Sequence, residues 1–188
     1  MHQLDSLDSA FLYLETANSP MHIGSVQIYE GRTEEFDFDR YRAMVAERMH
    51  LSPVFTRRIM HVPLNLGRPY WVEDPNFDLE AHLEHVALPG PGSWRQLRDV
   101  AEERFSIPMD PHRPLWSLTF VEGLDGIPEL PAGSFAVVSK IHHAAADGMG
   151  SVDLFSALWD EKPEGREIES AQPRSAEKLP GRINLLAR

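Results

Sequence analysis

The chain has 188 residues and no cysteine, which excludes disulfides, thiolate metal sites and a cysteine nucleophile. Its hydrophobic fraction of 42% and its nine phenylalanines favour a globular domain over a disordered chain. The net charge of -11 disfavours binding to a nucleic-acid backbone, and any polyanionic ligand would need a local basic patch. Arg57, Arg58 and Arg68 are the best candidates for that patch, although single arginines are more often solvated surface residues.

The sequence also bears on where the protein works. It contains no run of 18 apolar residues that could cross a membrane as a helix. Its first residues, Met1–Ser6, lack the basic segment and apolar core of a secretory signal. Together with the lack of cysteine, these features favour a cytoplasmic location.

The first half of the chain alternates between helical and extended patterns. Leu7, Phe11 and Leu14 recur at helical spacing after Asp5, whose side chain can cap a helix over residues 7–14. The further elements expected here are a strand over 22–29, a helix over 38–50 and short strands over 58–62, 70–72 and 82–88.

The second half continues this alternation and ends in a change of composition. Its expected elements are a turn over 89–92, a helix over 93–105, strands over 115–121 and 135–142, and a helix that follows Gly148 and Gly150 and uses Met149, Val152, Phe155, Leu158 and Trp159. From Glu161 the sequence turns to Lys, Glu, Pro, Arg and Ser, which is typical of a linker.

These elements predict an α/β fold, a two-layer sandwich with a mixed β-sheet. Residues 1–160 are expected to form one domain, and residues 161–188 are expected to form a linker in which 183–186 begin another element.

The sequence most suggestive of chemistry is Lys140–Gly150, which contains His142, His143 and Asp147 where an apolar strand ends. Adjacent strand residues point to opposite faces, so at most one of the two imidazoles enters a given cleft. A neutral imidazole can take a proton from a hydroxyl that attacks a carbonyl. Asp147 could orient an imidazole or brace the turn through an arginine, and the glycine at 148 permits close approach of a substrate.

Other interpretations of these residues remain open. A histidine at a strand end is often structural, and two histidines with an aspartate also occur in metal sites. A metal site is disfavoured because adjacent strand residues diverge and no third ligand motif accompanies them, so no metal is expected. The sequence has no Gly-x-Ser-x-Gly elbow, phosphate loop or dinucleotide fingerprint.

The segment from His142 to Gly148 resembles the His-His-x-x-x-Asp-Gly motif of the coenzyme A-dependent acyltransferase superfamily. More specific phrases resemble the bacterial wax ester synthase/diacylglycerol acyltransferase family, and the resemblance covers residues 4 to 160. These phrases are Leu7–Glu15, Ser19–Gly24, Arg113–Trp116 and Glu122–Leu124.

The resemblance implies a chloramphenicol acetyltransferase-like half-fold and a role for each motif residue. His143 would be the general base, His142 would support it, and Asp147 would hold the loop through an ion pair. Pro114, Leu115 and Trp116, like Gly148, would help to shape the substrate site, with plain core packing the alternative for Trp116. No cofactor is implied, because acyl-CoA is a substrate.

The resemblance further implies transfer of a fatty acyl group from acyl-CoA to diacylglycerol or a long-chain alcohol, without a covalent acyl-enzyme. Family members are roughly twice as long as this chain, so a C-terminal half is an expected partner, as a separate or missing chain. Peripheral contact with the inner membrane or lipid droplets is expected because the products are insoluble. The alternatives are a related acyltransferase with another acceptor or a carrier-bound donor, and a non-catalytic half-domain that binds lipid or a partner.

Overall fold

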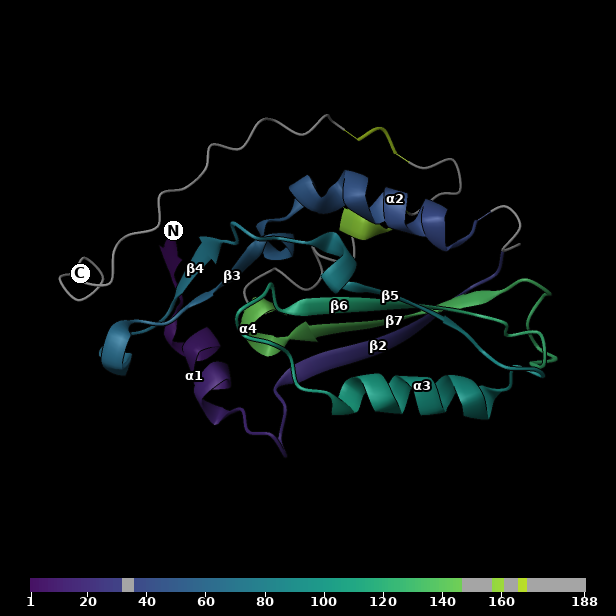
Figure 1. Ribbon diagram of the computed structural model, residues 1–188, viewed down its shortest axis with the longest axis horizontal. Coiled ribbons are helices and arrows are strands. Elements are labelled where there is room, and N and C mark those ends of the chain that lie inside the picture. Colours follow the sequence, from purple (N-terminus) through teal and green to yellow (C-terminus); the bar gives the residue numbers. More distant parts are fainter. Residues whose placement is uncertain (32–35, 147–156, 161–165, 169–188) are drawn as a thin grey trace.

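A four-stranded sheet forms the centre of the molecule (Figure 1). The computed structural model describes residues 1–31, 36–146, 157–160 and 166–168. The strand order is β2-β7-β6-β5, made by His22–Tyr29, Phe135–His142, Trp116–Glu122 and Leu83–Ala87. Both β2 and β6 pair antiparallel with β7, whereas β5 runs parallel to β6. The mixed α/β architecture predicted from the sequence is therefore confirmed.

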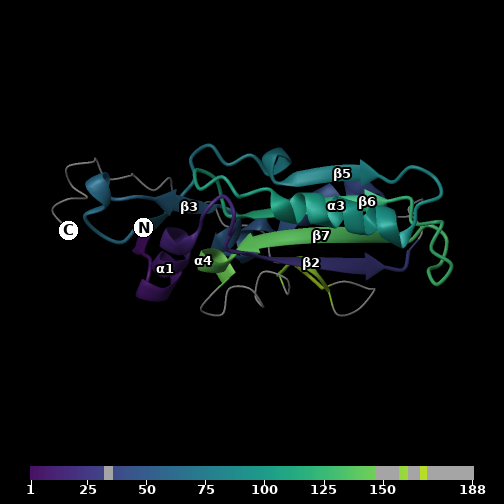
Figure 2. The same ribbon diagram turned by 90° about the horizontal axis from the view of Figure 1, so that it is seen from below.

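Two helices cover opposite faces of this sheet: α2, Phe38–Arg48, lies over one face (Figure 1) and α3, Trp94–Ser106, over the other (Figures 1 and 2). Because side chains alternate along a strand, β7 contributes to the core on both sides. Its Val137 packs in the cluster that contains residues of α2, and its Val138 packs in the cluster that contains residues of α3. All eight residues of β7 are buried, so the strand that carries the histidines has a rigid base.

Side-chain caps mark the starts of the longer helices in the described part of the chain. The side chain of Asp5 accepts a hydrogen bond from the first turn of α1, Ser6–Leu14, and Asp37 does the same for α2. Ser93 and Gln96 form a reciprocal capping box at the start of α3. Among the described residues there are also four single-turn 3-10 helices, at Met49–Leu51, Pro53–Phe55, Pro63–Asn65 and Leu79–Ala81.

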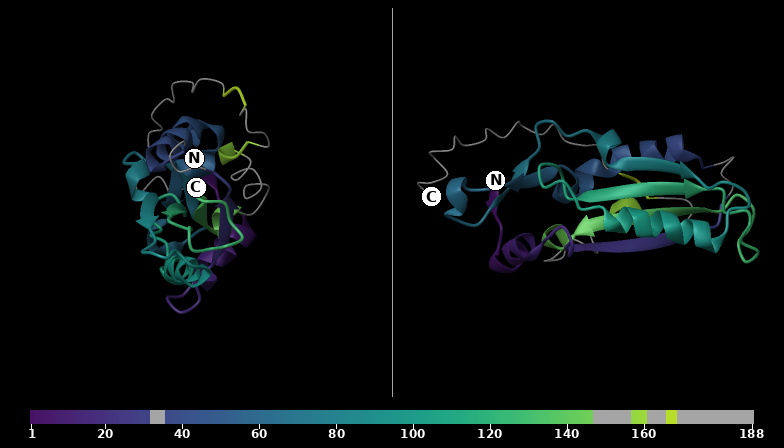
Figure 3. Two further views of the ribbon diagram at one scale, coloured as in Figure 1. Left: turned by 90° about the vertical axis from the view of Figure 1, so that its right-hand side faces the viewer. Right: turned by 60° about the horizontal axis from the view of Figure 1, so that its bottom comes forward.

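A second, smaller antiparallel sheet has the strand order β1-β4-β3, made by His2–Gln3, Tyr70–Glu73 and Arg57–Met60. Together with α1 it lies at the end of the molecule where β7 runs into the short helix α4, His143–Ala146 (Figures 1 and 3). Strand β1 is too short to show a pattern in the sequence and was not predicted. Its position brings the N-terminal segment close to the end of β7 that carries the histidines.

Two other expectations differ from the structure or fall outside it. The helix expected after Gly148 is preceded by α4, which begins directly at His143 because the chain turns as soon as it leaves the sheet. Most of the expected helix lies outside the described residues, although Ala157 and Leu158 are helical. The linker over 161–188 is described only at residues 166–168, so it stays a prediction.

The segment around residues 157–160 is held against α2 by a buried arginine. Arg48, 6% exposed, donates to the carbonyl of Leu158 and forms an ion pair with Asp160, with Nη2 2.5 Å from Oδ2. A buried charge is tolerated only when it is paired and hydrogen-bonded, and both conditions are met here. Arg48 therefore anchors Leu158 and Asp160 against α2.

Candidate active site

The two adjacent histidines at the end of β7 have different environments. His142 is the last residue of β7 and is 0% exposed, whereas His143 begins α4 and is partly exposed. The change from strand to helix between them directs the two side chains into different surroundings. The expectation that only one imidazole of the pair enters a given cleft stays a prediction.

The hydrogen bonds of His142 define its tautomer. Its Nδ1 accepts the backbone N–H of Ala144 at 3.0 Å, so the ring proton of the neutral imidazole lies on Nε2. The carboxylate oxygen Oε2 of Glu15 lies 3.5 Å from this Nε2, which has no hydrogen-bond partner within the described part of the chain. Burial lowers the pKa of His142, and the Glu15 carboxylate opposes that shift. His142 is therefore a neutral, enclosed residue near pH 7.

His143 is held from two sides by the N-terminal segment. Its backbone N–H donates to the carbonyl of Met21 at 2.8 Å. Its ring stacks on Phe11 of α1, with the ring centroids 4.8 Å apart and the planes inclined by 20°. The backbone and one ring face are thus fixed, and the rest of the imidazole is left partly exposed.

The structure explains why the N-terminal phrases matter, a role that the sequence did not reveal. Phe11 and Met21 contact His143, and Glu15 contacts His142, although all three lie more than 120 residues away in the chain. The phrases that contain them were available as a signal, but only as markers of the family. Their contacts now identify them as the wall against which the histidine pair packs.

A second group of contacts joins the strands to the end of α3. His22 Nε2 lies 2.8 Å from the carbonyl of Phe105, and Lys140 Nζ donates to the carbonyls of Arg104 and Ile107. These carbonyls are the unpaired acceptors that a helix leaves at its C-terminus. Burial lowers the pKa of Lys140, and the nearby Arg104 guanidinium adds to this shift.

The same region accounts for the glycine in the phrase Ser19–Gly24. A β-carbon at Gly24 would lie only 2.3 Å from the ring of Phe105, so any side chain would displace that ring. Gly24 therefore allows Phe105 to pack directly on strand β2.

The Pro114–Trp116 phrase enters the sheet beside the histidines. The carbonyl of Leu115 accepts the backbone N–H of His142 at 3.0 Å, and Leu115 itself is 2% exposed. Trp116 is 3% exposed and belongs to the hydrophobic core, where its Nε1–H donates to the carbonyl of Phe55 at 3.1 Å. Pro114 and Trp116 also line a cavity of about 270 Å³, which Leu115 does not. The expected substrate-binding role of these three residues stays a prediction.

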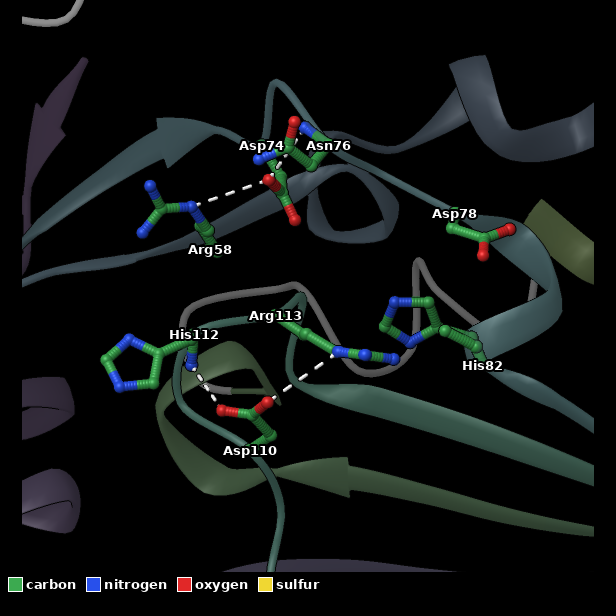
Figure 4. A pocket seen from close by; sticks show the side chains of 9 residues that line it. Arg58, Asp74, Asn76, Asp78, His82, Asp110, His112 and Arg113 are labelled. Atoms are coloured by element: carbon green, nitrogen blue, oxygen red, sulfur yellow. Dashed lines mark hydrogen bonds and ion pairs between the residues drawn. The ribbon is translucent and has the colours of Figure 1, made fainter.

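A larger cavity of about 430 Å³ lies next to this one (Figure 4). Its buried member is His82, whose Nδ1 lies 2.8 Å from the carbonyl of Trp116 and whose ring stacks on the indole, with centroids 4.5 Å apart. The remaining lining residues are mostly charged or polar: Arg58, Asp74, Asn76, Asp78, Ala81, Asp110, His112 and Arg113. Two arginines face aspartates at 3.5 and 3.6 Å, so opposite charges are matched across the cavity wall.

Two of the three arginines considered for a basic patch are engaged in similar pairs. Arg57 Nε lies 2.9 Å from Glu73, and Arg58 Nε lies 3.5 Å from Asp74. Arg68 contacts the hydroxyl of Ser6 at 3.5 Å and is exposed. Two of the three positive charges are therefore already compensated within the domain.

Two predicted site residues cannot be placed. Asp147 and Gly148 lie outside the described residues, so their roles stay predictions. Among the residues that are described, no three His, Asp or Glu side chains gather in a way that could hold a metal ion.

Two buried histidines and one partly buried histidine predict acid sensitivity. Burial lowers the pKa values of His22, His82 and His142 below the ordinary histidine value of about 6.5. Below pH 6.5 the unfolded chain binds protons that the folded domain excludes, so the free energy of unfolding should decrease as pH falls from 7 to 5. The slope for each such histidine is at most about 1.4 kcal/mol per pH unit.

Thermal melts across this pH range would measure the effect. His82→Gln removes one titrating group and should flatten the dependence of Tm on pH, whereas the exposed His112→Gln should leave it unchanged. An equally steep dependence in both variants would contradict the assignment to His82.

This chain is similar in sequence or in fold to several known proteins. The wax ester synthase/diacylglycerol acyltransferase catalytic domain family matches residues 4–186. The wax ester synthase/diacylglycerol acyltransferase from Marinobacter aquaeolei VT8 is 32% identical, with a TM-score of 0.68, over 88% of this chain and 40% of that one. A Mycobacterium tuberculosis relative, provisionally named a diacylglycerol O-acyltransferase, is 37% identical over 87% of this chain. The first condensation domain of the calcium-dependent antibiotic synthetase shares the fold, with a TM-score of 0.66 and 16% identity over 91% of this chain and 40% of that one.

The match covers most of this chain but only a minor part of the relative. The match with the Mycobacterium tuberculosis relative spans 34% of the relative's own length, so the chain corresponds to about a third of the curated proteins that it resembles. Within that third lie the histidine pair and the N-terminal phrases that pack against it. The match over residues 4–186 and the identity to relatives show that the chain belongs to the wax ester synthase/diacylglycerol acyltransferase catalytic domain family.

Proposed function

We propose that this chain carries the general base of an acyl-CoA-dependent O-acyltransferase, and that this base is His143. The acceptor would be the hydroxyl of diacylglycerol or of a long-chain alcohol, which yields triacylglycerol or a wax ester. The main observation in support is that the family's histidine pair has one fully enclosed member and one partly exposed member. Only the exposed member, His143, can meet a substrate without unfolding of the strand end.

The surroundings of His142 support a structural role for it. Both of its nitrogens are directed at protein atoms: Nδ1 at the backbone N–H of Ala144 and Nε2 at Glu15. An imidazole in this state has no free lone pair for a substrate proton. His143, stacked on Phe11 with its backbone fixed, has the properties expected of a positioned base.

The reaction would proceed in one ternary complex. Neutral His143 accepts the hydroxyl proton as the acceptor oxygen attacks the thioester carbonyl carbon, and a new C–O bond forms. The C–S bond then breaks, and the coenzyme A thiolate takes the proton from the imidazolium. No covalent acyl-enzyme is required, and the only cosubstrate is acyl-CoA. Hydrogen-bond donors for the developing oxyanion are also needed.

The domain organisation is part of the proposal. Residues 1–160 would form the N-terminal acyltransferase domain, and residues 161–188 would lead toward a C-terminal half, which the chain's coverage of about a third of its relatives supports. Asp147 would brace the loop after the histidines, and Gly148 and Pro114–Trp116 would help to shape the substrate site. The C-terminal half would complete that site.

The lipid substrates also bear on location. None of the described helices is both long enough and apolar enough to cross a membrane. The acceptors and products are insoluble in water, so we place the enzyme in the cytoplasm with peripheral contact at the inner membrane or at lipid droplets.

The first test is free-thiol release from palmitoyl-CoA with a panel of acceptors: diacylglycerol, hexadecanol, a short alcohol and water. It would be run on this chain alone and on the chain together with its C-terminal half. Release that depends on a lipid acceptor and needs the second half is the expected result. If no acceptor stimulates release from the two halves together, the donor is carrier-bound or the domain is a binding module, and the proposed function is wrong.

A further inference from the structure

We infer that Glu15 is the positioning residue of the site: its carboxylate places His143 through two chains of contacts that end on consecutive backbone amides, one made of hydrogen bonds and one that includes a 3.5 Å contact with His142. This inference rests on the proposed function of His143 as the base. Glu15 is the C-cap residue of α1, and its side chain is 22% exposed. It ends the phrase Leu7–Glu15, and it contacts both Met21 of the next phrase and His142.

The first arm runs through the backbone of Met21, the residue that precedes strand β2. Glu15 Oε1 accepts the backbone N–H of Met21 at 3.2 Å. The carbonyl of the same residue, Met21, accepts the backbone N–H of His143 at 2.8 Å. A shift of Glu15 would therefore move the peptide group that holds His143.

The second arm runs through the enclosed imidazole. Glu15 Oε2 faces Nε2 of His142 at 3.5 Å, a long contact, and Nδ1 of that ring accepts the backbone N–H of Ala144 at 3.0 Å. Because the ring is fully buried, it has no water with which to replace either partner. The orientation of the ring thus connects Glu15 to the first turn of α4.

The same helix that ends at Glu15 also supplies the ring that packs on the base. The backbone N–H of Glu15 donates to the carbonyl of Phe11 at 3.1 Å, and Phe11 stacks on His143. The two arms and this stacking contact meet on residues 143 and 144. Helix α1 and the start of α4 therefore behave as one packed unit around the base.

The two arms require a carboxylate at position 15 because each oxygen of Glu15 faces a hydrogen-bond donor. The Met21 amide and the Nε2–H of His142 each need an acceptor, and a carboxylate presents one on each oxygen. A glutamine has a single acceptor oxygen, so its amide NH₂ must face one of the two donors. If His142 changed tautomer instead, its Nδ1–H would oppose the N–H of Ala144. Glu15→Gln consequently breaks one connection in every arrangement while preserving side-chain volume.

The test compares Glu15→Gln with Glu47→Gln, a matched loss of one carboxylate on the exposed side of α2. In the chain assembled with its C-terminal half, Glu15→Gln should lower kcat on the order of 10–100-fold with little change in KM for palmitoyl-CoA, because the base is misplaced. Glu47→Gln should retain full kcat. Glu15→Asp restores two acceptor oxygens at a shorter reach and should recover part of the loss.

A second measurement does not depend on turnover. The ¹⁵N spectrum of histidine-labelled protein should show His142 as the Nε2–H tautomer, and Glu15→Gln should alter that signal whereas Glu47→Gln should not. If Glu15→Gln keeps full kcat while His143→Ala loses activity, the role of Glu15 is wrong and the proposed function still stands. Retained activity in His143→Ala would overturn the proposed function. Even in that case, an unchanged His142 signal in Glu15→Gln would separately refute the positioning contact of Glu15.

Discussion

Replacing His143 with alanine is expected to reduce acceptor-dependent thiol release by about 10²–10⁴-fold, the usual contribution of a positioned general base. The imidazole is partly exposed and its main packing contact is the stacked ring of Phe11, so its removal leaves the core intact. Tm should accordingly change little. Steady-state assays with palmitoyl-CoA and the preferred acceptor would measure the loss of turnover, and thermal melts would confirm that the fold is retained.

Two other histidines provide the comparison for this variant. His112→Ala changes an exposed loop histidine and should keep full activity. His142→Ala removes an enclosed ring that accepts a hydrogen bond from Ala144, so it should lower both activity and Tm. If His143→Ala retained near-full turnover in the assembled enzyme, the base would have to be another group and the domain could be non-catalytic.

The sequence predicted the elements whose patterns are local. Strand His22–Tyr29 and strand Phe135–His142 have the expected bounds because both show continuous apolar or alternating residues. The start of α1 follows Asp5, whose side chain caps it as expected, and the start of α3 lies at Ser93, as expected for a helix over 93–105. Caps and periodicity are determined within a few residues, so a single sequence reveals them.

The contacts that build the site could not be predicted in this way. Glu15 and His142 lie 127 positions apart in the chain, and their contact depends on how α1 folds back beside the end of β7. The short helix α4 also follows from packing, since His143–Ala146 carry no capping signal of their own. The resemblance to a family identified which phrases matter, but only the structure relates Phe11, Glu15 and Met21 to the histidines.

For Trp116 the sequence left open whether the indole shapes the substrate site or packs in the core. Its replacement has the largest expected effect on stability. Trp116→Ala should lower the free energy of unfolding by roughly 3–5 kcal/mol, the usual result of deleting a buried aromatic side chain. The indole is 3% exposed, it meets Phe55 edge to face with centroids 5.4 Å apart, and it stacks on His82. Its loss would also leave the carbonyl of Phe55 without the Nε1–H donor.

Denaturant unfolding of Trp116→Ala, Trp116→Phe and Trp94→Ala would separate packing from substrate contact. Trp94 is 47% exposed at the start of α3, so its removal should cost little and serves as the matched control. Trp116→Phe keeps an aromatic ring between Phe55 and His82, and it should recover most of the stability that alanine loses. Wild-type stability in Trp116→Ala, with a raised KM for the lipid acceptor, would show instead that the indole serves the 270 Å³ cavity that it lines. A large loss of stability would mean that the family's Pro-Leu-Trp phrase acts first by anchoring the strand that abuts the histidines.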